Sequence, residues 1–148
     1  MRFLITGLTG FAGPHLANLL HKEGHEVCGI VRGTNGREND IRDVVPDEVF
    51  DKITWFWLDF FDRTKVEDLF RSEKFDGVFH LGAQSHPPSS FEDPHMTYEM
   101  NVMGSINLIE AVVRHQPNCK FMFCSTSEVY GDTCPEGGIL HEINSPVL

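Results

Sequence analysis

The chain has 148 residues, of which 41% are hydrophobic and 23% are charged, as is ordinary for a single folded domain. Asp and Glu number 22 against 12 Lys and Arg, so the formal net charge is −10. A negative field of this size repels nucleic acid and anionic membranes, and we expect neither as a partner. Because no apolar run approaches the roughly 20 residues that span a bilayer, we expect a cytoplasmic protein.

Cysteine and histidine give no sign of a metal site. The four cysteines have no C-x-x-C spacing, and the eight histidines are scattered along the chain. Cys28 and Cys124 fall within predicted strands, where a thiol behaves as a small apolar side chain. The sequence therefore predicts reduced thiols and no bound metal.

The opening of the chain combines a short apolar run with regularly spaced glycines. Residues Arg2–Ile5 predict a buried strand, and Gly7, Gly10 and Gly13 follow at once. An amphipathic run from His15 to Glu23 then predicts a helix. Strand, glycine turn and helix N-terminus form the arrangement that cradles the pyrophosphate of a dinucleotide. We predict a nicotinamide-cofactor site here; the alternative is an ordinary strand-to-helix turn that is rich in glycine.

Strand and helix alternate along the remainder of the chain. Further strands are predicted at Glu26–Val31, Ile53–Leu58, Gly77–Gly82 and Lys120–Ser125. Helices are predicted from Asp62 to about Ser72 and from Pro94 to about His115, with a short one near Ile41–Val45 and a loop after Ser127. The second long helix carries apolar residues at helical spacing, namely Val102, Ile106, Ile109 and Val113. The alternation predicts an α/β fold of Rossmann type, a doubly wound parallel sheet with helices on both faces.

The residue after the second predicted strand bears on the choice of cofactor. A cofactor without a 2′-phosphate calls for an Asp or Glu about 20 residues past the glycine turn, and none stands there. Arg32 occupies the position instead, and a guanidinium suits a phosphate group and can stack on adenine. The sequence favours NADP over NAD; the alternative is that Arg32 is a solvated loop residue.

The ends of the third and fourth strands supply further candidates, since ligands of doubly wound folds lie beyond the carboxyl ends of the strands. Asp59 is expected to accept a hydrogen bond from the adenine amino group and Asp62 to cap the next helix; the alternative is that either acid serves only as a cap. After the fourth strand, small residues allow close approach of a cofactor, and Gln84, Ser85 and His86 carry hydrogen-bonding groups. The proline-rich stretch from Pro87 to Ser90 then predicts a stiff loop beside the substrate, unless the whole segment is a plain loop.

The fifth strand ends in hydroxyl side chains followed by an acid. Thr126 is suited to hydrogen-bond a substrate hydroxyl, and Glu128 can act as a general acid or base. Taken alone, the string could equally be a strand end with a turn.

These segments together resemble the extended short-chain dehydrogenase/reductase family, and more closely its nucleotide-sugar 4,6-dehydratases. Residues Thr6–Gly13 look like the cofactor turn of that family. Residues Leu81–His86 and Ser125–Gly131 are similar to the corresponding stretches of GDP-mannose 4,6-dehydratase. The pair Thr126 and Glu128 is the more selective feature, since epimerases of the family usually lack the glutamate.

The resemblance implies a redox-neutral reaction on a nucleotide-diphosphate sugar, GDP-linked in the nearest relatives. Hydride would leave sugar C4 for bound NADP and return to C6, while Glu128 removes the C5 proton and Thr126 binds the C4 hydroxyl. The residues expected to contact the cofactor are Gly7, Thr9, Gly10, Phe11, Ala12, Gly13, Arg32, Asp59, Phe60, Leu81, Gly82, Ala83, Gln84 and Ser125. Those expected to contact substrate are Ser85, His86 and Ser127.

Other readings stay open. A GDP-4-keto-6-deoxymannose reductase or a sugar-nucleotide epimerase of the same family would share most of these residues. A non-catalytic NADP-binding module would share the fold without the chemistry. The sequence also departs from GDP-mannose dehydratases at Gly33, where a second Arg is common, and at Asn101, where Asp is frequent.

The family's Tyr-x-x-x-Lys pair is absent and would be expected shortly after Leu148. We therefore expect residues 1–148 to form the N-terminal, NADP-binding domain of a protein about twice as long, inactive without the remainder. The resemblance further implies a homo-oligomer, a dimer or tetramer, formed through helices that include the one from Pro94 to His115.

Overall fold

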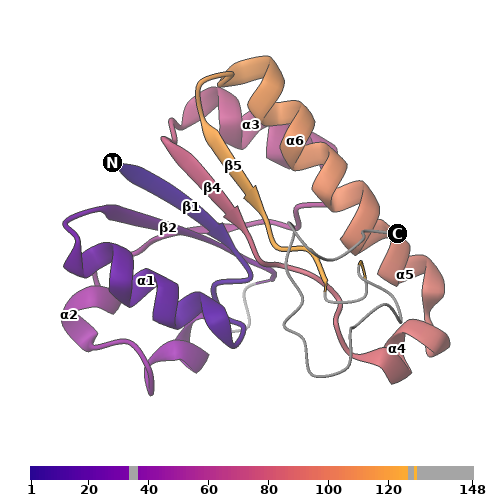
Figure 1. Ribbon diagram of the computed structural model, residues 1–148, viewed down its shortest axis with the longest axis horizontal. Helices are drawn as coiled ribbons and strands as arrows, with labels where there is room; N and C mark the ends of the chain where they lie inside the picture. Colours follow the sequence, from indigo (N-terminus) through magenta and orange to yellow (C-terminus); the bar gives the residue numbers. More distant parts are fainter. Residues whose placement is uncertain (34–36, 127–128, 130–148) are drawn as a thin grey trace, which may run out of the picture.

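Five parallel strands form a single sheet in the order β3-β2-β1-β4-β5 (Figure 1). The computed structural model describes residues 1–33, 37–126 and 129. The strands are β1 (Arg2–Thr6), β2 (Glu26–Val31), β3 (Thr54–Trp57), β4 (Gly77–His80) and β5 (Lys120–Phe123). The chain builds the sheet outward from β1 in one direction and then in the other, so the point where the order switches lies between β1 and β4.

Helices cover both faces of this sheet, which confirms the predicted doubly wound fold. Helices α1 (Ala12–Lys22) and α2 (Asp47–Phe50) lie on one face, and α3 (Arg63–Ser72) and α6 (Gly104–His115) lie on the other (Figure 1). Two separate hydrophobic clusters fill the two interfaces. Leu4 and Ile5 are both fully buried, one in each cluster, because successive side chains of a strand point to opposite faces.

The connecting segments are short and lie mostly at the carboxyl edge of the sheet. They are η1 (Arg37–Ile41), α4 (Pro87–Glu92), α5 (Pro94–Tyr98) and the π-helical segment η2 (Glu99–Met103). None of the helices among the described residues has the length and apolar character needed to cross a membrane.

Three sequence predictions in these connections are wrong. Ile41 ends η1, and residues 42–45 form a turn between η1 and α2 instead of a helix, because Pro46 disfavours helical backbone at Val45. The stretch from Pro87 is not a stiff loop but the first turn of α4, a position where proline's missing N–H costs nothing. The fourth strand stops at His80 instead of Gly82, whose N–H bonds to the Thr6 side chain.

The single long helix predicted from Pro94 to His115 is interrupted. It consists of α5, the wider π turn η2 and α6. The Ser105 hydroxyl donates to the Asn101 carbonyl, and Gly104 packs so closely on Phe60 that a Cβ there would lie 2.4 Å from the ring. A π turn is a frequent device for re-aiming side chains at functional sites.

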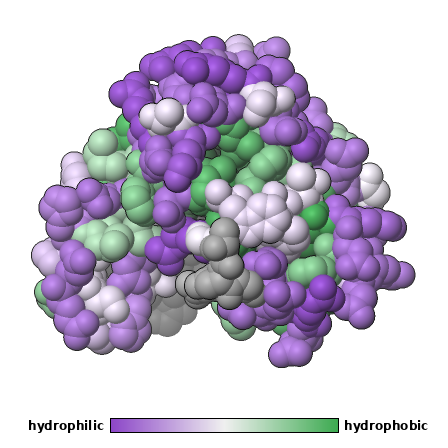
Figure 2. Space-filling view, turned by 180° about the vertical axis from the view of Figure 1, so that it is seen from behind, coloured by the Kyte–Doolittle hydropathy of each residue, from purple (hydrophilic) through white to green (hydrophobic). Residues whose placement is uncertain are grey.

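The apolar stripe predicted for the long helix, which begins in η2 and continues along α6, faces away from the core. The side chains that α6 buries against the core include Leu108, Ala111 and Val112. The residues whose spacing predicts the helix are instead 38% to 68% exposed, namely Val102, Ile106, Ile109 and Val113. On the reverse side of the molecule, apolar residues also gather in the centre of a hydrophilic rim (Figure 2). The domain therefore leaves apolar surface uncovered.

Helices α3 and α6 are joined at the edge of the sheet remote from the carboxyl ends of the strands. The buried Gln116 side chain accepts from Phe75 N and donates to the carbonyls of Phe70 and Glu73, at 2.8 to 2.9 Å. Glu67 of α3 bonds to His115 and Arg114 of α6, and this hydrogen bonding from His115 holds the pKa of the Glu67 carboxyl below its usual range. These contacts fix the helix pair without involving the opposite edge.

Candidate cofactor and substrate site

The glycine turn after β1 is held by close backbone contacts. Gly7 has a φ of +70°, and its carbonyl accepts from Gly10 N at 2.9 Å. A Cβ on Gly7 would lie 2.7 Å from Gly82 N, and one on Gly13 would lie 2.5 Å from Leu8 Cα. A side chain at either position would displace backbone, so the turn requires glycine. The N-terminus of α1 is thereby brought to the carboxyl edge of the sheet, where its free N–H groups favour an anion.

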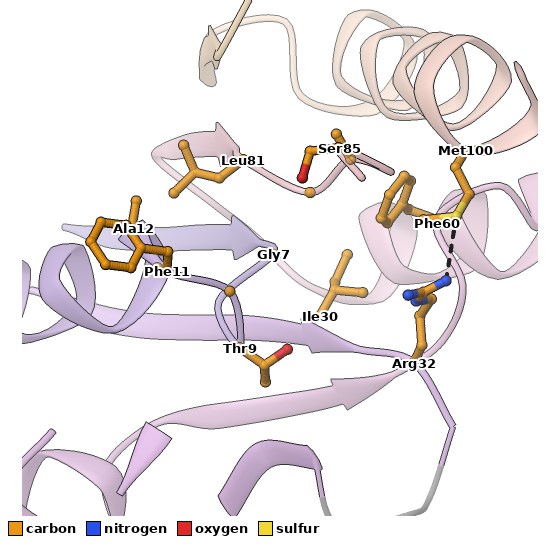
Figure 3. A pocket seen from close by; sticks show the side chains of 14 residues that line it. Gly7, Thr9, Phe11, Ala12, Ile30, Arg32, Phe60, Leu81, Ser85 and Met100 are labelled. Carbon is orange, nitrogen blue, oxygen red and sulfur yellow. Dashed lines mark hydrogen bonds between the residues drawn. The ribbon is translucent and has the colours of Figure 1, made fainter. Parts of the chain in front are cut away.

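A cavity of about 360 Å³ opens over this turn (Figure 3). It is lined by most of the residues expected to contact the cofactor, namely Gly7, Thr9, Gly10, Phe11, Ala12, Gly13, Arg32, Phe60, Leu81, Gly82 and Ala83. Ile30 and Met100 also line it and are absent from the sequence prediction. The alternation of β2 could have indicated Ile30, whereas Met100 reaches the cavity only through the fold of η2.

Arg32 stands at the mouth of this cavity. Its guanidinium extends from the end of β2 toward η2, and Nη1 lies 3.3 Å from the sulfur of Met100 (Figure 3). The Arg32 side chain is otherwise exposed, and among the described residues this weak sulfur acceptor is its one hydrogen-bond partner. The cation is therefore available to an anionic group lying in the cavity.

Asp59 follows β3, immediately before the cavity-lining Phe60. One of its carboxylate oxygens, Oδ1, is buried and has no hydrogen-bond partner among the described residues. Buried carboxylate oxygens are rarely left without a donor. Asp59 does not itself line the cavity, although its neighbour Phe60 does. An exocyclic amino group such as that of adenine would supply the donor if it reached this edge of the cavity, and together with the glycine turn this fits a dinucleotide. Asp62 forms the cap expected of it, with its side chain accepting from Lys65 N.

A second cavity of about 520 Å³ lies on the other side of the segment after β4. Leu81, Gly82, Ala83 and Ser85 line both cavities, so the segment Leu81–Ser85 is their shared wall. The remaining lining residues from the sequence prediction are Gln84, Ser125 and Thr126. The end of β5, where the hydroxyl residues stand, therefore meets the second cavity. Ser127 and Glu128 lie outside the described residues.

The polar side chains after β4 are engaged with the backbone. Gln84 donates to the carbonyl of His86 and accepts from its N–H, both at 3.0 Å. His86 lines neither cavity; its Nδ1 lies 3.0 Å from the Ser89 hydroxyl at the start of α4. Gln84 and His86 thus shape the loop. Their roles toward cofactor and substrate stay predictions.

His80 is the one buried histidine of the described residues, with 2% of its surface exposed. The rings of Phe60, Phe121 and Phe123 surround it at centroid distances of 5.4 to 6.1 Å. Burial lowers the pKa of His80 to about 4, so the imidazole is neutral near pH 7.

Neither a metal cluster nor a disulfide is found in the part of the chain that the structure describes. No three side chains of His, Cys, Asp or Glu in that part come together to hold a metal ion. Cys28, Cys119 and Cys124 are free thiols, and Cys134 lies outside the described residues.

Comparison with known proteins gives a consistent result. The family model described as GDP-mannose 4,6 dehydratase matches residues 4–142. A GDP-mannose 4,6-dehydratase of Yersinia enterocolitica is 36% identical over 135 residues, which are 86% of this chain and 36% of that enzyme. The chain thus spans little more than a third of this relative's length.

Solved structures of similar fold cover almost the whole of this chain. The UDP-Glc/GlcNAc 4-epimerase of Campylobacter jejuni superposes with a TM-score of 0.81 and 28% identity, over 99% of this chain and 43% of that one. UDP-glucose 4-epimerase of Thermus thermophilus, solved in complex with NAD, has a TM-score of 0.75 and 32% identity, over 96% and 43%.

The sheet order, the glycine turn at its switch point and these neighbours define a Rossmann-type domain of the extended short-chain dehydrogenase/reductase class. Within that class the matched residues extend over almost the whole chain. The protein belongs to the GDP-mannose 4,6-dehydratase family, which confirms the resemblance drawn from its motifs.

We expect the stability of the protein to fall in mild acid because of His80. An unfolded histidine titrates near 6.5, whereas burial lowers the pKa of His80 to about 4. As the pH falls below 6.5, the unfolded chain therefore binds a proton that the folded chain does not. The free energy of unfolding should drop by about 2 kcal/mol between pH 7.5 and pH 5 from this group.

Urea unfolding at the two pH values measures this loss. The His80→Gln variant has no titrating ring, so its loss should be smaller than that of the wild type by about 2 kcal/mol. Protonation of carboxylates such as Glu67 also destabilises the folded protein in acid, but this loss is the same in the wild type and in the variant. An identical loss in the two proteins would contradict a depressed pKa at His80.

Proposed function

We propose that this chain is the NADP-binding part of a nucleotide-sugar 4,6-dehydratase that acts on a GDP-linked hexose. The observation that carries the proposal is the shared wall Leu81–Ser85, with the cavity over the glycine turn on one side and the end of β5 on the other. The family match through residue 142 supports the same reaction. The share of relatives that the chain spans supports a longer protein, whose remainder would carry the Tyr-x-x-x-Lys pair.

The first cavity suits a dinucleotide in three respects. The pyrophosphate would lie over the glycine turn at the N-terminus of α1. The adenine amino group would satisfy Asp59 Oδ1, and the exposed Arg32 guanidinium would bind a 2′-phosphate, which favours NADP. When bound, the nicotinamide supplies a reversible hydride acceptor.

The residues of this chain would handle the sugar and its protons. Thr126 lines the second cavity and would hold the C4 hydroxyl by a hydrogen bond. Glu128 would remove the C5 proton as a general base and then assist departure of the C6 hydroxyl as water. Ser85, Ser127 and the nearby His86 would bind other parts of the nucleotide sugar.

A 4-epimerase is the second candidate, because the solved structures reported above are epimerases at 28% and 32% identity. Epimerases share oxidation at C4 but release no water and usually lack an acid at the position of Glu128. A reductase would consume NADPH in proportion to product. Loss of water from GDP-mannose without added reductant therefore separates the dehydratase from both alternatives, and from a non-catalytic module.

We also propose that the protein forms a homo-oligomer through α6. Val102 of η2 and Ile106, Ile109 and Val113 of α6 are exposed apolar residues at helical spacing, and exposed apolar surface of this kind marks a protein interface. The charged residues Arg63 and Glu110, paired at 2.8 Å, lie at the same helix pair and would form a polar rim.

Replacing Ile109 with Glu should dissociate such an oligomer, because a carboxylate would be buried in the apolar face. Sedimentation equilibrium should give the monomer mass for Ile109→Glu and a multiple of it for the wild type. Leu19→Glu is the matched control, since Leu19 is an exposed apolar residue of α1 on the other side of the sheet. A monomeric wild type would contradict the proposal.

Arg32→Ala should remove the preference for NADP over NAD. Losing a charge-assisted hydrogen bond to the 2′-phosphate should raise the Kd for NADP by about tenfold relative to the Kd for NAD. Calorimetric titration of both dinucleotides measures this ratio. Arg42→Ala serves as control, because Arg42 bonds to Asp47 and stacks on Phe50, away from the cavity. An unchanged ratio would show that Arg32 does not read the phosphate.

Glu128→Gln in the full-length protein should slow dehydration of GDP-mannose by about 100-fold or more, the usual contribution of a general base. The Kd for NADP should stay the same. Product formation without added reductant is the assay, and Glu48→Gln, at an exposed acid of α2, is the control for loss of a carboxylate elsewhere. Unchanged turnover in Glu128→Gln would rule out the assigned role.

A further inference from the structure

His80 lies in the middle of a buried chain of hydrogen bonds that links three elements. Its Nδ1 is 2.6 Å from the Thr6 hydroxyl at the end of β1, and its Nε2 is 2.9 Å from the Ser105 hydroxyl in α6. All three side chains are buried, with at most 8% of their surface exposed. None of the three has a role in the function proposed above.

The groups at the two ends of this chain determine where the imidazole proton resides. The Ser105 hydroxyl lies 2.7 Å from the Asn101 carbonyl, which can only accept, so the single Ser105 proton points there. His80 Nε2 must then carry a hydrogen and donate it to Ser105. At the other end, Gly82 N donates to the Thr6 hydroxyl at 3.0 Å, and Thr6 donates onward to the bare Nδ1. Every donor therefore meets an acceptor only in the neutral, Nε2-protonated form.

Both ends of the hydrogen-bonded chain act on the wall between the two cavities. At one end, Thr6 holds Gly82 against the glycine turn. At the other end, Asn101 clamps Gln84, accepting from its N–H at 2.7 Å and donating to its carbonyl at 2.9 Å. The segment Leu81–Ser85 is thus anchored twice, and both anchors lead back to the same imidazole.

The wall has no free space toward the glycine turn. A Cβ on Gly7 would lie within 2.9 Å of three backbone atoms of Leu81 and Gly82. A shift of the wall by a fraction of an ångström would therefore alter the first cavity where its two backbones meet. Replacing the His80 side chain removes the connection between Thr6 and Ser105 and permits that shift.

We propose that His80 is a positioning residue, a neutral imidazole protonated at Nε2 that sets the spacing between the Leu81–Ser85 wall and the glycine turn, and through it the affinity for the dinucleotide. The affinity part rests on the proposed cofactor binding. Asn101 contributes to the same positioning, because its amide donates to the Gln84 carbonyl and an Asp there would lack that donor.

The protonation state is tested first. In the protein labelled with nitrogen-15 at its imidazoles, the His80 signals, assigned by their loss in His80→Gln, should show the hydrogen on Nε2 and no titration between pH 8 and pH 5.5. A hydrogen on Nδ1, or a midpoint near 6.5, would overturn the assignment. This measurement needs no cofactor.

The positioning role is tested by affinity. His80→Phe keeps the ring shape without its polar atoms and should raise the Kd for NADP by about tenfold. His80→Gln should recover most of the affinity, because its amide offers one acceptor and one donor. Ser105→Ala keeps the imidazole and should give an intermediate loss of affinity for NADP. This variant also tests the proposal if His80→Phe does not fold.

Gln116→Leu is the matched control. It removes an equally buried polar connector at the opposite edge of the sheet, so it should lower Tm without changing the Kd. The proposal fails if His80→Phe and Ser105→Ala bind NADP as the wild type does. It also fails if Gln116→Leu lowers Tm by as much as His80→Phe does and weakens NADP binding by the same factor. A wild type that binds neither NADP nor NAD would overturn the proposed function instead, while the imidazole spectra would still decide the protonation of His80.

Discussion

The site depends on the close approach of two backbone segments, the turn at Gly7 and the end of β4 at Gly82. They touch without intervening side chains, and a Cβ on Gly7 would lie 2.7 Å from Gly82 N. This contact is possible because β1 and β4 are neighbours in the sheet and both end at the same edge. The glycine turn, the N-terminus of α1 and the wall after β4 are consequently brought together around one cavity.

The wall after β4 borders a different cavity on each of its two faces. One face borders the cavity over the glycine turn, and the other borders the cavity that Ser125 and Thr126 enter from the end of β5. The Thr6–His80–Ser105 chain supports the wall from beneath with a group that stays neutral.

Local patterns were sufficient for the regular elements. The run Arg2–Ile5 and the spacing of the three glycines correctly predicted β1 and the turn, and Asp62 correctly marked the start of α3. Patterns failed where distant groups decide the backbone. The π turn of η2 leads into Gly104, which packs against the distant Phe60. The buried face of α6 includes the polar residues Ser105 and Asn107, while the apolar Ile106, Ile109 and Val113 are exposed.

The sequence determined the class of fold and which residue types meet at the carboxyl edge. The alternation of strands and helices along the chain and the spacing of the glycines are both local patterns that short segments contain. The tertiary structure decided how those residues are used. It brought Met100 against Arg32, left one Asp59 oxygen buried without a donor among the described residues, and turned Gln84 back onto its own loop. It also made His80 a connector, since its partners Thr6 and Ser105 stand 74 and 25 residues away and meet only when β1, β4 and α6 pack together.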